Sequence, residues 1–130
     1  MAREQNTMIE HNSAHGMLRL YRPRDYARAL QIQRLGADQD EPVLSCAAAL
    51  GLTWQTGPND GKPQADWIKA RGAYRYGELV LNELIDRGWT LGQVVAGGQA
   101  ALPLIADMIN DMVTEKDVKA AEAFTEQGGG

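Results

Sequence analysis

Apolar residues recur at helical spacing on both sides of one short break in the second half of the chain. Before the break they lie about one turn apart, at Tyr76, Leu79, Val80, Leu84 and Ile85. After it they continue at Val94, Val95, Leu102, Ile105, Met108, Ile109 and Met112. Amphipathic helices have this period, so the pattern predicts a helical hairpin over residues 74–113. We expect the rest of the chain to be organised around this hairpin.

The break at residues 87–90 carries the signals that end one helix and start another. Gly88 follows a basic last turn, where a residue with positive φ commonly ends a helix. Thr90 and Gln93 form the T-x-x-Q pattern of a capping box. Trp89 precedes the cap, and we expect it to pack on Val94.

The second arm of the hairpin contains residues that weaken a helix. Gly97 and Gly98 each cost about 1 kcal/mol relative to alanine, and Pro103 removes a backbone donor. We therefore expect a kink near Pro103, or a break at the glycines followed by a restart. Small residues also allow another helix to approach closely, which is the favoured explanation. A phosphate-binding loop is not indicated, because the lysine and the preceding strand of a P-loop are missing.

The N-terminal part of the chain is polar and aperiodic over residues 1–16, which indicates a flexible arm. His11 and His15 lie four residues apart, but no third ligand completes a metal site. The stretch Met17–Tyr21 is partly alternating and could form a strand. Since no partner strand is evident in the chain, we expect it to pack as an extended segment or to pair with another protein.

Two helices are expected between this segment and the hairpin. Pro23 opens the first, over residues 24–35, with arginines around its outer side. The second is short and very apolar, over residues 42–50, and Gly51 is expected to end it. Cys46 lies inside it with no histidine near in sequence, so we interpret it as a small core residue rather than a nucleophile.

The C-terminal segment, residues 114–130, is predicted to form a separate helix capped by Thr114, projecting from the body and followed by a glycine tail. The predicted fold class is therefore all-α. It has a flexible arm at 1–16, a helical domain at 17–113 and a C-terminal helix and tail at 114–130.

Composition agrees with one small domain. The 130 residues are 44% hydrophobic, but only 6% are aromatic, so the core depends on aliphatic side chains and an oligomer could help to bury it. The net charge of −4 is uneven: residues 1–36 hold six basic and three acidic side chains, and the remainder is acidic. This balance disfavours a nucleic-acid-binding protein, although the basic first third keeps that alternative open. A single cysteine and the lack of a long apolar run point to a reducing cytosol and no transmembrane helix.

The sequence shows no grouping of residues that is typical of a catalytic or metal-binding site. No pair of carboxylates, no Ser-His-Asp set and no cluster of metal ligands stands out. We therefore expect a protein that is not an enzyme and that has no cofactor.

Three stretches carry a resemblance to a known family: Cys46–Trp54, then Tyr76-Gly77-Glu78 with Leu84 and Arg87-Gly88, then Ala96-Gly97 with Ala101-Leu102. Over about residues 40–113 the chain resembles the small tail assembly chaperones of tailed bacteriophages. The resemblance implies a largely helical, oligomerising protein in the host cell cytoplasm. It also implies binding to the tape-measure protein and assistance to tail-tube assembly, without a cofactor. Such chaperones often have a longer, frameshifted form, and the Gly128–Gly130 tail could reflect a guanine-rich slippery run, a remnant of cloning or a plain flexible end.

The expected partner-binding site is an apolar groove around Val94, Val95, Leu102 and Ile105, opened by the neighbouring small residues. Arginines such as Arg24 and Arg28 are either a solvated face or a docking surface for an acidic partner. The alternative function is a structural virion subunit, a connector or tail-terminator component, whose N-terminal arm would lace neighbouring subunits together. A third interpretation is a small regulator that binds nucleic acid through the arginines of residues 19–34.

Overall fold

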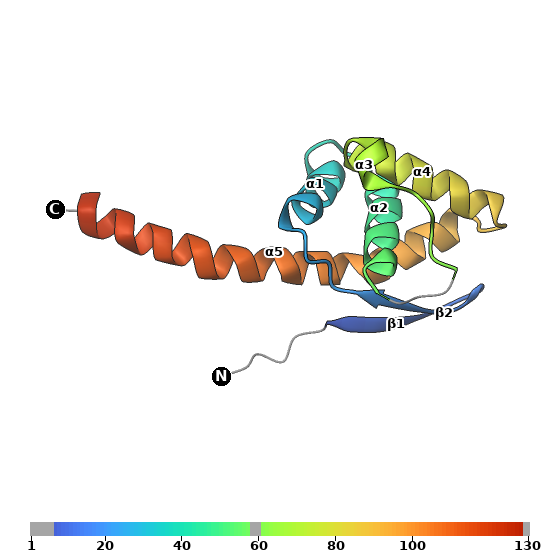
Figure 1. Cartoon of the computed structure of the whole chain (residues 1–130), viewed down its shortest axis with the longest axis horizontal. Helices are drawn as coiled ribbons and strands as arrows, with labels where there is room; N and C mark the ends of the chain where they lie inside the picture. The colour runs from blue at the N-terminus through green and yellow to red at the C-terminus, as the bar shows by residue number, and fades with distance from the viewer. Residues whose placement is uncertain (1–6, 58–60, 129–130) are drawn as a thin grey trace.

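The structure, a computed structural model, describes residues 7–57 and 61–128, with side chains through residue 111. The described part is mostly helical and begins with a small antiparallel hairpin (Figure 1). The elements in chain order are β1 (Met8–Ser13), β2 (Gly16–Tyr21), α1 (Tyr26–Ala37), α2 (Pro42–Gln55), α3 (Trp67–Ala70), α4 (Ala73–Asp86) and α5 (Leu91–Gly128).

Helix α2 is the centre of the fold. Every residue from Ser45 to Trp54 is buried, and the helix packs against α1, α4, α5 and β2. Figure 1 shows it in the middle of the body, with α3 and α4 on one side and α5 and the hairpin on the other. The expectation that α4 and α5 organise the chain is therefore wrong: α2 lies between them, and they contact each other much less than each contacts α2.

Glycines allow α4 and α5 to approach the α2 backbone. A Cβ at Gly77 of α4 would lie 2.6 Å from the Leu44 carbonyl oxygen, and a Cβ at Gly98 of α5 would lie 2.3 Å from Cys46 Cβ. The favoured explanation of the small residues in the second arm, close approach of another helix, is confirmed.

Gly51 also lies where another helix approaches α2 closely. The prediction that α2 ends at this glycine is wrong. The helix continues past Gly51 to Gln55, because Gly51 faces α4, where a Cβ would meet Val80 at 2.6 Å and the Tyr76 hydroxyl at 2.9 Å. Packing of α4 against this position outweighs the weak helix propensity of glycine.

The turn between α4 and α5 confirms the local signals. Gly88 has φ +95°, its N–H donates to the Ile85 carbonyl, and the Trp89 N–H donates to the Leu84 carbonyl, as in a Schellman motif. Thr90 and Gln93 form the reciprocal capping box, with bonds of 2.9 and 3.1 Å.

Helix α5 is continuous, which contradicts the expected break at the glycines and the separate helix starting at Thr114. Pro103 lies on the exposed side of the helix, whereas Leu104, Ile105, Met108 and Ile109 are buried. Water can therefore satisfy the carbonyl that Pro103 leaves without a partner, while packing holds the apolar stripe together. The C-terminal part of α5 extends away from the body (Figure 1).

The hairpin β1–β2 corrects the predicted flexible arm, whose residues 1–6 lie outside the described part. Ile9 pairs with Leu20 and His11 with Leu18, so Met17–Tyr21 does have a partner strand in this chain. A two-stranded hairpin is marginal alone and needs packing on a neighbour. Here Leu18 and Leu20 are buried against the helices, and β2 contacts α2 while β1 contacts α5.

The turn of the hairpin is also held from a distance. The His15 ring stacks on Trp89, with ring centroids 4.6 Å apart, and its Nε2 donates to Gln93 Oε1 at 2.8 Å. His15 is therefore engaged at the α4–α5 turn. Among the described residues, no group of three or more His, Cys, Asp or Glu side chains could hold a metal ion.

Candidate functional site

The expected groove on α5 is filled by α2. Val94 and Ile105 are buried in the core, and Val95 and Leu102 are half-buried beside them. The small residues between them open toward α2: a Cβ at Gly97 would touch the Leu50 methyl groups at 2.9 and 3.1 Å. The structure therefore places no open groove at these four positions.

The two arginines named with the groove lie in different surroundings. Arg24 is exposed and lines a depression of about 320 Å³ with Tyr21 and Thr56. Arg28 forms an ion pair with Asp25 at 3.3 Å, and its guanidinium lies 5.4 Å from the centre of the Trp67 ring. Arg28 lines a different surface hollow.

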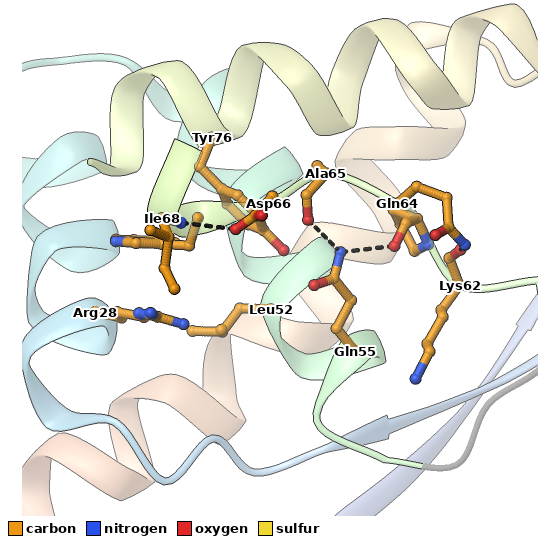
Figure 2. A pocket seen from close by; sticks show the side chains of 11 residues that line it. Arg28, Leu52, Gln55, Lys62, Gln64, Ala65, Asp66, Ile68 and Tyr76 are labelled. Carbon is orange, nitrogen blue, oxygen red and sulfur yellow. Dashed lines mark hydrogen bonds between the residues drawn. The ribbon is translucent and has the colours of Figure 1, made fainter. Parts of the chain in front are cut away.

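This hollow, which we call the Ile68 hollow, has a volume of about 310 Å³ and is shown in Figure 2. Ile68 and Arg28 lie on one side of it and Lys62 on the other (Figure 2). Its walls come from α1, α2, α3, α4 and the segment that joins α2 to α3. The lining residues are Arg28, Leu52, Gln55, Lys62, Pro63, Gln64, Ala65, Asp66, Trp67, Ile68 and Tyr76.

Residues 61–66, which lead into α3, are held on their α2 side by the side chain of Gln55. Gln55 Nε2 donates to the carbonyls of Pro63 and Ala65, at 2.7 and 3.0 Å (Figure 2). Asp66 then caps α3, because its carboxylate accepts from the Ile68 N–H at 2.9 Å.

The same segment is also held on its α4 side. The Glu83 carboxylate accepts from the Gln64 N–H at 2.8 and 2.9 Å. Arg87 pairs with Glu83 and donates to the carbonyls of Gly61 and Lys62. Since backbone groups on both sides are bonded, the wall of the hollow is formed before any partner arrives.

The surface of the hollow combines apolar and charged groups. Ile68 is 75% exposed, the most of any large apolar residue in the described part of the chain, and Trp67 beside it is half-buried. Arg28, Lys62 and Asp66 add charges around this apolar centre. Such a centre with a polar border resembles the composition of protein-binding surfaces.

Tyr76 lies at the base of the hollow and is fully buried. Its hydroxyl forms no hydrogen bond within the described part of the chain, and its ring packs on Trp67 with centroids 4.9 Å apart. Burial raises the pKa of this phenol above its ordinary value of 10.0, so the hydroxyl stays protonated at neutral pH.

Cys46 is buried in α2, as expected for a core residue. Burial raises the pKa of its thiol, which disfavours the reactive thiolate.

The part of the chain that the structure describes contains no helix with the length and apolar character to cross a membrane.

The sequence contains one signal for the Ile68 hollow. Asp66 before Trp67-Ile68 indicates the start of a helix, and two adjacent large apolar residues on one short helix point in different directions. One of them therefore has to face away from the core. The other walls come from residues between 28 and 76, and their convergence depends on the tertiary fold.

We compared the chain with protein-family models, with curated proteins and with solved structures, and none of them matches it.

Proposed function

We propose that the protein is a non-enzymatic tail assembly chaperone of a tailed bacteriophage, which binds the tape-measure protein and assists tail-tube assembly. The resemblance over residues 40–113 supplies the family and the partner. The structural observation that carries the proposal is the Ile68 hollow, where an exposed aliphatic side chain lies in a preformed, polar-bordered depression.

Binding at this hollow would bury Ile68 under an apolar side chain of the tape-measure protein. Full burial of an isoleucine side chain contributes about 1.5–3 kcal/mol. At a rate of tenfold for each 1.4 kcal/mol, this is about 10- to 100-fold in affinity. The bonds that hold residues 61–66 reduce the ordering that binding would require, which favours affinity further.

Helix α5 supports the same proposal in a second way. It runs without interruption from its packing against α2 to Gly128, and its C-terminal part leaves the body (Figure 1). A longer, frameshifted form, as the resemblance implies, would carry its extension at the end of this helix. The body would then stay available for the tape-measure protein.

The test is capture of the tape-measure protein by co-expression with the tagged chain. We expect Ile68→Asp to reduce capture about tenfold or more, because it places a charge at the apolar centre. Ile85→Asp is the matched control, since Ile85 is 45% exposed on α4 and lies outside the hollow. Equal loss of capture by both variants, or by neither, would contradict binding at the Ile68 hollow.

The alternative, a structural virion subunit, draws its support from a free N-terminal arm. Residues 8–21 instead form a hairpin packed on the body, so this support is weaker.

The support for nucleic-acid binding through residues 19–34 is also weaker, because acidic side chains interrupt the basic surface. Arg19 forms an ion pair with Glu10, Arg22 with Asp111 and Arg28 with Asp25.

A further inference from the structure

A second hollow, of about 420 Å³, lies between α1 and the start of α4. Three arginines from three parts of the chain line it: Arg34 near the end of α1, Arg71 at the end of α3 and Arg75 in the first turn of α4. We call it the arginine hollow. Gln31, Gln39 and Tyr74 complete its polar and aromatic wall.

The arginine hollow has a strongly positive lining. In the part of the chain that the structure describes, no carboxylate lines it. Within the described residues, Arg34 and Arg71 form no ion pair, and Arg75 has only an exposed pair with Glu78 at 3.3 Å. An exposed pair of this kind is weak, so Glu78 can be replaced by another anion. Three guanidinium groups around one concavity are suited to planar anions, which they bind in a bidentate manner.

The backbone at Arg71 provides a second, independent observation. Arg71 ends α3 in the left-handed conformation, with φ +61° and ψ +42°. Glycine is the residue usually favoured at such a position, because a Cβ is strained there. An arginine at this position costs stability relative to glycine, and residues in this conformation are enriched at functional sites. The Arg71 side chain is exposed and lines the hollow.

The start of α4 adds to the positive potential. Gly72 is the N-cap and provides no side chain to bond the first N–H groups of the helix. These groups carry partial positive charge and lie at the wall of the hollow, together with Ala73 and Tyr74.

We propose that the arginine hollow binds the carboxylates of an acidic segment of a protein partner. The concave shape suits a short segment, and Tyr74, which is 47% exposed, offers an apolar contact beside the charges. A nucleic acid fits less well, because its regular row of phosphates would extend beyond the hollow over a chain whose net charge is −4. This site is separate from the Ile68 hollow and does not rest on the proposed function.

The experiment is a titration of the full chain against a fluorescein-labelled peptide of six glutamates and one leucine, followed by fluorescence polarisation. We expect binding at about 50 mM salt that weakens strongly at about 300 mM, because exposed charges are screened. The double variant Arg34→Gln/Arg75→Gln should weaken binding several-fold and at most about 25-fold, from up to about fivefold for each exposed ion pair. Arg24→Gln, outside the hollow, should bind like the wild type.

The variant Arg71→Gly distinguishes a role of Arg71 in peptide binding from a role in stabilising the fold. It should weaken peptide binding several-fold and at the same time raise the melting temperature, because glycine relieves the left-handed backbone. Loss of binding with a lower melting temperature would contradict this account of Arg71.

The proposal is overturned if the double variant binds as well as the wild type. It is equally overturned if the same arginines bind a DNA duplex of about 20 base pairs more tightly than the peptide, or if inorganic phosphate alone displaces the peptide below about 1 mM.

Discussion

The close approach of α2 and α5 at Gly98 leads to a quantitative prediction. In Gly98→Ala the new Cβ would lie 2.3 Å from Cys46 Cβ and 2.5 Å from its Cα and carbonyl oxygen, where ordinary contact begins at 3.4 Å. Two of these three atoms belong to the α2 backbone, so no side-chain rotation relieves the clash. The helices would have to separate by about 1 Å, which loosens a well-packed core.

Two opposing effects set the magnitude. Replacing a glycine inside a helix with alanine stabilises the helix by about 1 kcal/mol. Overpacking of a core costs about 1–3 kcal/mol, and a clash with backbone belongs at the upper end of this range. The expected result is a net loss of about 2 kcal/mol, which for a chain of this size lowers the melting temperature by roughly 8 °C.

Thermal unfolding followed by circular dichroism measures this shift, and two glycines of the same helix are its controls. At Gly92 the nearest atom to a Cβ would be Thr90 Oγ1 at 4.0 Å, so Gly92→Ala should not destabilise the chain. Gly97→Ala meets only the flexible end of Leu50 and should lie between the two. If Gly98→Ala melts at or above the temperature of Gly92→Ala, the close packing of α2 on α5 is refuted.

Two further substitutions test the α4–α5 turn and the base of the Ile68 hollow. Thr90→Ala removes one bond of the capping box and should lower the unfolding free energy by about 1 kcal/mol, whereas an unchanged denaturant midpoint would show that the cap is unimportant. Tyr76→Phe removes a buried, unpaired hydroxyl and should leave stability at pH 7 equal or higher by about 1 kcal/mol. Burial raises the folded-state pKa of Tyr76, so above about pH 10 the unfolded chain loses this proton first and the wild type loses stability relative to Tyr76→Phe. Parallel pH profiles of melting temperature for the two proteins would contradict that assignment.

Local signals predict the α4–α5 turn well, because Gly88, Thr90 and Gln93 act on their own neighbours. They fail where distant contacts decide the structure. Strand β1 is polar and its sequence indicates a flexible arm, yet its turn is anchored by His15 on Trp89, far along the chain. The local pattern ends a helix at Gly51, but packing against Val80 keeps this glycine inside one.

The sequence predicts the candidate binding sites less well than it predicts the α4–α5 turn. Arg28 stands out in the sequence and does line a hollow, whereas Val94 and Ile105 belong to the core. An apolar stripe with small residues has the same pattern whether it faces a partner protein or another helix of the same chain. The choice between the two depends on α2, whose own apolar surface extends almost all the way round.

Whether the protein is an assembly chaperone or a particle subunit is decided by comparing two samples from one infected or co-expressing culture. One is the set of proteins captured by the tagged chain, and the other is the purified particles, both analysed by quantitative mass spectrometry. A chaperone of tail assembly should capture the tape-measure protein and be absent from the mature particle. Presence in the particle at a fixed copy number, without capture of the tape-measure protein, would contradict the chaperone proposal and support a structural subunit.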